Sequence, residues 1–312
     1  MPQGCRGAWF RAMGEVRFMT SDSTEFLLES RLRQLDPRLH QRFADAVLAL
    51  QHMPFRYLRL FPEFIDHSSL HSMSVIDFCN RLIGPAQVAM LNEDAIYTLL
   101  MGCYLHDVGM GISVELYQEL SRELPIDEYR QRYPAAKVTD IVRDFHHELS
   151  ALFVRKYAEF FDIPSPEHTF AIMQVCRGHR KTDLFDQTLF PPHWTVGNGH
   201  EVYLPYLASL IRLADEIDVT AARNPAMLYD IERLTDELEV NHHKRHKAVR
   251  SLVIADDSFV LQVAPCEPQV EAMVGTMAHK MQETLDRCRS VVASSTPFVI
   301  SQERVLVEWL GA

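Results

Sequence analysis

The sequence contains no apolar run long enough to cross a bilayer, and its first twenty residues do not resemble a signal peptide. Arg6, Arg11, Glu15 and Arg17 interrupt that segment. A membrane-spanning helix needs about 20 consecutive apolar residues, and a signal peptide needs an uninterrupted apolar centre. We therefore expect a protein that crosses no membrane and works in the cytoplasm.

Cysteine is scarce and scattered. The six cysteines stand at positions 5, 79, 103, 176, 266 and 288, without C-x-x-C spacing. Thiolate zinc sites use closely spaced pairs of cysteines, and disulfide frameworks belong to small secreted chains. The pattern argues against both and fits reduced thiols inside a helical core.

An excess of positive charge is also missing. Lysine and arginine number 31 against 42 acidic residues, so the formal net charge is −11. A broad nucleic-acid groove requires clustered positive charge, so nucleic acid is not the expected partner. A small phosphorylated substrate held by metal ions remains compatible with this balance. The 47% content of hydrophobic residues is ordinary for a globular chain.

Apolar periodicity predicts that residues 23–247 are almost entirely helical, with breaks between the helices. Proline and glycine interrupt the periodic segments at 84–85, 125, 164–166 and 191–199. The longest irregular segment, 180–200, is a candidate loop over a site. The expected helices cover residues 23–35, 38–52, 69–83, 92–107, 113–124, 136–161, 167–178, 200–219 and 225–246.

The pattern changes near residue 248. Two short β-rich runs within 249–263 predict a hairpin, a helix is expected at about 267–293, and a last strand lies within 298–307. The domain organisation predicted is a loose segment 1–22, a helical domain 23–247 and a small α+β cap 248–312. Met273, Met277 and Met281 share one face of the cap helix. That face either packs on the cap's own hairpin or forms a surface for a protein partner or a second copy.

Asp215 lies on the apolar side of its own helix. At about 100° per residue, Asp215 and Asp218 fall on the stripe formed by Leu204, Leu207, Ala208 and Ile211. A carboxylate turned into a core costs several kcal/mol unless it is paired or binds a metal ion. The sequence allows two explanations: a metal ion, or a buried ion pair with Arg212 or Arg223.

Histidines occupy similar positions elsewhere. His106 and Asp107 end a helix that is apolar on nearly all sides and are followed by Gly109 and Gly111, which permit a sharp turn. In the helix 136–161, periodicity places His146 at the edge of the buried stripe and His147 on the opposite face.

His71 near the start of one helix and His179 at the end of another complete the candidate set. Imidazoles and carboxylates without thiolates suit Mn, Fe, Ni, Co, Zn or Mg. A carboxylate between two groups of imidazoles can bridge two ions, and two ions can act together on a phosphoester. We therefore expect a divalent metal cofactor of one or two ions.

These residues resemble the H…HD…D signature of the HD-domain metal-dependent phosphohydrolase superfamily. The resemblance covers about residues 60–225. It rests on Asp66-His67-Ser68-Ser69-Leu70-His71, on Leu105-His106-Asp107-Val108-Gly109, and on the segment from Leu210 to Arg223. It implies a mainly α HD-type helical bundle, here followed by the small α+β cap. The branch that carries a GYP tripeptide is a poor match, because Arg180-Lys181-Thr182-Asp183 follow His179.

The resemblance also implies roles for individual residues. His71, His106, Asp107 and Asp215 would hold one ion, and Asp107, His146 and His179 would hold a second. Asp66, His67 and Asp218 are candidates for orienting the ligating imidazoles.

The function expected is hydrolysis of a phosphate ester, on a nucleotide or a related small molecule, by a water that the metal activates. Asp107 would anchor the metal, while Arg180 and Lys181 would hold the substrate phosphate. Two alternatives remain open at this point. One is a metal-bearing module that senses a nucleotide and signals through the cap, and the other is a di-iron oxygenase.

Overall fold

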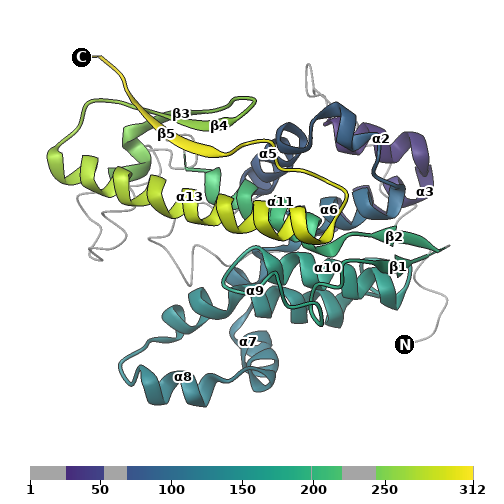
Figure 1. The fold of residues 1–312 in the computed structure, drawn as a ribbon. Coiled ribbons are helices and arrows are strands. Elements are labelled where there is room, and N and C mark those ends of the chain that lie inside the picture. The colour runs from purple at the N-terminus through teal and green to yellow at the C-terminus, as the bar shows by residue number, and fades with distance from the viewer. Residues whose placement is uncertain (1–25, 53–68, 198, 220–243, 312) are drawn as a thin grey trace.

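The computed structural model describes residues 26–52, 69–197, 199–219 and 244–311. The fold is mainly helical and carries a small three-stranded sheet in its C-terminal part (Figure 1), as the sequence predicts. Within those ranges, no helix is both long and apolar enough to span a membrane.

Four helices form the centre of the molecule: α6 (Glu93–Leu105), α9 (Val138–Tyr157), α10 (Pro166–Gly178) and α11 (Leu204–Ile217). The helix α10 packs against each of the other three. Nearly every residue of α6 is buried, which explains its lack of a polar face. Asn92 begins α6 by accepting a hydrogen bond from the backbone N–H of Ala95.

The N-terminal helices α2 (Leu27–Leu35), α3 (Pro37–His52) and α5 (Ser69–Val88) pack around α6. The helix α5 continues beyond the expected end at residue 83, but it changes direction at Gly84. Gly84 has φ +69°, a conformation that glycine adopts at little cost, and Pro85 then begins the last turns.

Short helices connect α6 to α9. They are the 3₁₀ turn η1 (Val108–Met110), α7 (Val114–Leu120), the 3₁₀ turn η2 (Ser121–Glu123) and α8 (Ile126–Arg132). Figure 1 shows α7 and α8 together at one end of the molecule. The sequence predicts one helix over 113–124 and none at α8, where only a short, exposed helix forms after Pro125.

The expected irregular segment 180–200 ends in a hairpin. The strands β1 (Trp194–Val196) and β2 (His200–Val202) pair antiparallel, and α11 begins only after them, at Leu204. The Asn92 side-chain amide donates a hydrogen bond to the carbonyl of Glu201. This hydrogen bond holds the hairpin against the start of α6.

The C-terminal part contains β3 (Val249–Ile254), β4 (Ser258–Val263), α13 (Pro268–Ser295) and β5 (Arg304–Trp309). The strands β3 and β4 form the expected antiparallel hairpin, and β5 joins β4 in parallel. The helix α13 lies along α11 (Figure 1), and Met277 and Met281 on its inner face are buried. Most of the helix expected at 225–246, and the segment 1–22, lie outside the described residues.

Candidate metal centre

The ends of several helices meet at one buried point. His106 and Asp107 follow the last residue of α6, and His179 follows α10. His71 comes from α5, His146 from α9 and Asp215 from the last turn of α11. Apart from Asp215, whose side chain is 16% exposed, all of these side chains are buried.

The first group of potential ligands consists of His71, His106, Asp107 and Asp215. Each residue offers one ligand atom, and these atoms lie within 4.8 Å of one another. His71 Nε2 is 3.2 Å from His106 Nε2 and 3.3 Å from Asp215 Oδ1. The structure thus brings together the four residues that the sequence predicts for one ion.

The second group consists of Asp107, His146 and His179. Asp107 Oδ1 lies 3.3 Å from His146 Nε2 and 3.4 Å from His179 Nε2. The other oxygen, Oδ2, lies 3.4 Å from His106 Nε2 and 3.5 Å from His71 Nε2. Asp107 is therefore placed between the two groups with one oxygen toward each.

The hydrogen bonds on the outer side of the rings decide which nitrogen carries the proton. The Nδ1 atoms of His106, His146 and His179 each contact the backbone carbonyl three residues earlier, at 3.0, 2.7 and 2.5 Å. Because a carbonyl only accepts, each Nδ1 donates, and a neutral ring then has a bare lone pair at Nε2.

Bare lone pairs consequently face each other across the centre. His146 Nε2 and His179 Nε2 are 2.9 Å apart, although neither carries the hydrogen that a bond between them would require. Such an arrangement is repulsive when no cation lies between the nitrogens. The donor set and its protonation therefore fit a divalent metal ion.

Burial also favours the neutral forms of His146 and His179. Loss of hydration lowers the pKa of His146 well below its ordinary value, and the same cause lowers the pKa of His179. The Asp107 carboxylate opposes both shifts but does not cancel them. Neutral histidine is the form that ligates metals.

A carboxylate orients one of the rings. Asp218 Oδ2 lies 2.7 Å from His71 Nδ1, so it accepts that proton and turns Nε2 toward the centre. Asp218 is buried, as its helical position predicts. Asp66 and His67, the other candidates for this role, lie outside the described residues.

Gly109 allows η1 to approach α9 closely. Its backbone N–H donates to Ser150 Oγ at 2.9 Å, and a Cβ atom added at Gly109 would collide with the carbonyl oxygen of His146 and lie 2.9 Å from Leu149 Cβ. The sequence indicates a sharp turn as the reason for this glycine. The structure shows instead that the space for a side chain is missing.

Arg212 holds the segment that follows α10. Its guanidinium donates to the carbonyls of Gly178, Arg180 and Thr182 at 2.7, 3.0 and 2.6 Å. The three carbonyls belong to residues on both sides of His179. The sequence allows an ion pair between Arg212 and Asp215, but the guanidinium of Arg212 is engaged by these carbonyls instead. The other suggested partner, Arg223, lies outside the described residues.

Arg180 and Lys181 add positive charge beside the second group. The charge of Arg180 contributes to lowering the pKa of His146 and of His147. Lys181 Nζ contacts Asp144 Oδ1 at 2.6 Å, and its side chain is 53% exposed. Lys181 also has φ +24°, a strained value for a residue with a side chain.

The sequence-based placement of His147 on an exposed face is wrong. His147 is 6% exposed, and its ring centroid lies 6.3 Å from that of His179. Burial is the largest cause that lowers the pKa of His147 to about 3, and positively charged neighbours lower it further. Its Nδ1 atom is buried without a hydrogen-bond partner among the described residues.

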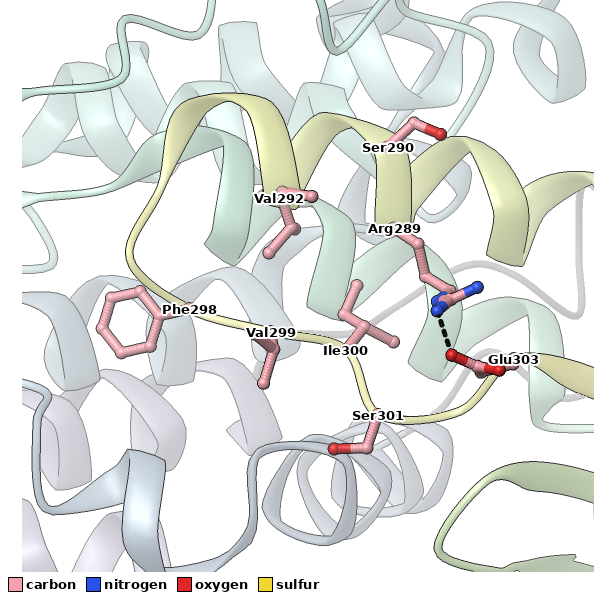
Figure 2. Close-up of a pocket in the computed structure, with 9 residues that line it drawn as sticks. Arg289, Ser290, Val292, Phe298, Val299, Ile300, Ser301 and Glu303 are labelled. Carbon is pink, nitrogen blue, oxygen red and sulfur yellow. Dashed lines mark hydrogen bonds and ion pairs between the residues drawn. The ribbon is translucent and has the colours of Figure 1, made fainter.

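A separate cavity lies away from this centre, between the end of α13 and the segment leading to β5 (Figure 2). It has a volume of about 490 Å³, and Arg289 and Glu303 form an ion pair at 2.5 Å on its wall. None of the metal-centre residues lines this cavity. The buried His and Asp side chains, rather than the cavity, are thus the candidate site.

Comparison with known proteins identifies one related family. The family model described as HD-CE matches residues 61–289. That range includes both ligand groups and extends through β3 and β4 into α13. No curated protein matches the sequence.

Proposed function

The chain belongs to the HD-CE family, and from this membership we propose that it is a metal-dependent phosphohydrolase. Its substrate would be a nucleotide or a related small phosphate ester. Its cofactor would be one or two divalent ions, held by His71, His106, Asp107 and Asp215 and by Asp107, His146 and His179.

The observation that carries the proposal is the position of Asp107. Its two carboxylate oxygens point to different groups of imidazoles, at 3.3 to 3.5 Å. A carboxylate in this position suits a centre with two ions, in which both the attacking and the leaving oxygen of a phosphoester can be stabilised. When bound, such ions supply Lewis acidity and a water nucleophile at neutral pH.

The chain's own residues orient the centre. Asp218 fixes the His71 ring, and the carbonyls of Cys103, Arg143 and Cys176 fix the other three imidazoles. Arg212 holds the segment 178–182 through three carbonyls. The ligands are therefore held in place by buried hydrogen bonds, which is the condition for a preorganised site.

Arg180 and Lys181 are the proposed contacts for the substrate phosphate. Arg180 is half-buried and acts electrostatically on His146, so an anion bound beside that ring would meet its charge. Lys181 would exchange the carboxylate of Asp144 for a phosphate oxygen. The acidic net charge of −11 supports a small substrate rather than a nucleic acid.

The proposed compartment is the cytoplasm. The five described cysteines are all free thiols, and Cys79 Sγ and Cys103 Sγ lie 3.9 Å apart as a hydrogen-bonded pair rather than a disulfide. Free thiols at this separation support a reducing environment.

The experiment that tests the function combines metal analysis with a hydrolysis panel. The wild-type protein and Asp107→Asn would be loaded with Mn²⁺, Fe²⁺, Ni²⁺, Co²⁺, Zn²⁺ or Mg²⁺ and assayed on nucleotides and simple phosphodiesters. We expect the wild type to bind metal and release product, and Asp107→Asn to lose both. Asp286→Asn, an exposed substitution on α13, is the matched control and should behave as wild type.

Three other outcomes would contradict the proposal. Full hydrolysis by Asp107→Asn would remove the centre from the reaction. Bound metal with no turnover on any substrate would favour a regulatory module. Bound iron with oxygen consumption, and no hydrolysis with any metal, would favour a di-iron oxygenase.

A further inference from the structure

A second cluster of metal-ligating side chains lies at the opposite end of α6 from the metal centre. Glu93 and Asp94 stand in the first turn of α6, and His200 stands in β2. One ligand atom from each lies within 4.8 Å of the others. Because α6 has 13 residues, about 20 Å of helix separates this cluster from His106.

The imidazole of His200 faces both carboxylates. Its Nδ1 lies 2.7 Å from Asp94 Oδ2 and 3.5 Å from Glu93 Oε1. Asp94 is buried, while the side chains of Glu93 and His200 are 25% and 36% exposed. The cluster therefore has a buried base and one side open to solvent, through which an ion can enter.

His168 supports Asp94 from the other side. Its Nε2 donates to Asp94 Oδ1 at 2.7 Å, and its Nδ1 lies 3.0 Å from Ser165 Oγ. Burial alone would raise the pKa of Asp94, but the hydrogen bonds from His168 and His200 outweigh it and lower the pKa. One oxygen of Asp94 is thus held by His168, and the other is directed toward His200 and Glu93.

The β1–β2 hairpin closes over this cluster. A Cβ atom at Gly197, in the turn, would lie 3.4 Å from Asp94 Oδ2 and from His168 Cε1. The Trp194 indole donates to the carbonyl of Glu167 at 3.0 Å and packs on Phe170 of α10. The hairpin therefore contacts the first turns of both α6 and α10 at the point where the ligand atoms meet.

We propose that Glu93, Asp94 and His200 form a second divalent-metal site of the zinc type, which ties the β1–β2 hairpin to α6. An imidazole with two carboxylates suits Zn²⁺ better than Ca²⁺ or Mg²⁺, which prefer oxygen ligands alone. Zn²⁺ would take the place of the hydrogen that His200 Nδ1 donates to Asp94. That hydrogen passes to solvent while Nε2 takes one up, so the ring stays neutral and binds the ion through Nδ1. Solvent would complete the coordination on the open side.

The site would fix the alignment of the two helices that end at the catalytic ligands. Asp94 on α6 and His168 on α10 contact each other near the starts of these helices. His106 and His179 follow their ends, with ring centroids 4.9 Å apart. An ion that holds Asp94 in place therefore stabilises the relative position of α6 and α10 over their whole length.

Zinc content and backbone hydrogen exchange test the proposal without reference to catalysis. The full chain, stripped with a chelator, would be titrated with Zn²⁺ as wild type, Glu93→Gln and His200→Ala. The matched control is His193→Ala, because His193 flanks the same hairpin, is 63% exposed and contacts Glu201 but lies outside the cluster. We expect the two ligand variants to bind one Zn²⁺ fewer per chain than wild type and the control to match wild type.

The exchange rates of backbone amides in the β1–β2 hairpin show whether Zn²⁺ binds there. At Zn²⁺ about 100 times the dissociation constant, amides of residues 194–202 should exchange about 100-fold more slowly in the wild type, and His200→Ala should abolish this protection. Equal zinc content in wild type and His200→Ala, or exchange in the wild-type hairpin that Zn²⁺ does not change, would overturn the site. Both readouts are independent of phosphate hydrolysis, so a failure of the catalytic proposal leaves this test intact.

Discussion

His146 and His179 place their Nε2 atoms 2.9 Å apart, while a backbone carbonyl accepts a hydrogen bond from each Nδ1. Two buried lone pairs that face each other repel, so the metal-free fold carries a local cost that a cation removes. At metal concentrations about 100 times the dissociation constant, we expect a gain of about 2.7 kcal/mol in the free energy of unfolding.

The measurement is thermal unfolding with and without added Mn²⁺, Ni²⁺ or Zn²⁺ after chelator treatment. His179→Ala removes one ligand of the second group and should shrink the metal-dependent rise in Tm. His279→Ala, on the exposed face of α13, should leave that rise unchanged. An equal rise in His179→Ala and wild type would show that His179 takes no part in binding.

The pH dependence of stability should reveal His147. Burial lowers its pKa to about 3 in the folded chain, whereas an unfolded histidine titrates near 6.5. Below about pH 6.5 the unfolded chain therefore binds a proton that the folded chain does not, and stability falls as the pH falls. Each such histidine contributes up to about 1.4 kcal/mol per pH unit.

Denaturant unfolding of the chelator-stripped protein between pH 7 and pH 4.5 checks this expectation. His147→Gln should show a shallower decrease in stability than wild type over that range. His279→Gln, which is exposed, should keep the wild-type slope. Identical slopes in all three proteins would mean that His147 is protonated in the folded state.

Gly109 should tolerate no side chain. A Cβ there would collide with the carbonyl of His146 and press on Leu149, so Gly109→Ala forces η1 away from α9. Overpacking of this kind costs about 1 to 3 kcal/mol. Gly275→Ala is the matched control, since no atom lies within 4 Å of a Cβ at Gly275 in α13, and alanine stabilises helix interiors by about 0.5 to 1 kcal/mol.

Chemical denaturation of the two alanine variants measures both effects. The two substitutions should shift the unfolding midpoint in opposite directions. A Gly109→Ala variant as stable as wild type would mean that η1 and α9 separate without loss of packing. Metal content should fall together with stability in Gly109→Ala, because the added methyl group would displace the backbone of His146, a proposed ligand.

Helical periodicity and the positions of helix ends identified candidate residues of the metal centre, whereas their division into two ligand groups came from the resemblance to the HD-domain superfamily. Asp215 on an apolar stripe, and His106 with Asp107 at the end of an apolar helix, are local patterns that depend only on 3.6 residues per turn. The same reasoning gave the wrong position for His147, which is buried. The helix α9 packs against α10 and also against η1 and α7, so it is buried on more than one side, and a single stripe cannot represent it.

The β1–β2 hairpin could not be predicted from local sequence. Its strands have three residues each, too few for an alternating pattern to be recognised. Contacts from Asn92 and Asp94, about a hundred residues earlier in the chain, hold it in place. The packing role of Gly109 could not be predicted either, because it depends on a contact with the backbone of α9, about 40 residues later in the chain.

Arg212 should be required for the geometry of the segment that carries His179. In Arg212→Met the carbonyls of Gly178, Arg180 and Thr182 lose their donor, and hydrogen bonds to charged groups contribute about 1.5 to 3 kcal/mol each. Burial lowers the pKa of Arg212, yet a guanidinium remains charged in proteins. We expect a loss of several kcal/mol and weaker metal binding at His179.

Thermal unfolding and metal titration of Arg212→Met measure these losses. The control is Arg81→Met, which removes an exposed ion pair with Asp77 at 3.7 Å and the contact of the guanidinium with the Phe78 ring. Pairs of this kind contribute about 1 kcal/mol at most. If the two variants lost the same stability, Arg212 would have no special role in holding the segment.

Asp218→Asn should weaken metal binding without unfolding the protein. The amide oxygen can still accept from His71 Nδ1, which now lies 2.7 Å from the carboxylate, but the negative charge that strengthens the ring's basicity disappears. Changes to groups that orient a metal ligand reduce affinity by about 10- to 100-fold. Competition with a chelator of known affinity gives the number, and Asp77→Asn, an exposed substitution in the same helix as His71, is the control. Unchanged affinity in Asp218→Asn would mean that the peptide framework of α5 alone orients His71. A loss confined to Asp218→Asn would instead show that the end of α11 orients His71 through Asp218 at Nδ1, in addition to placing Asp215 3.3 Å from His71 Nε2.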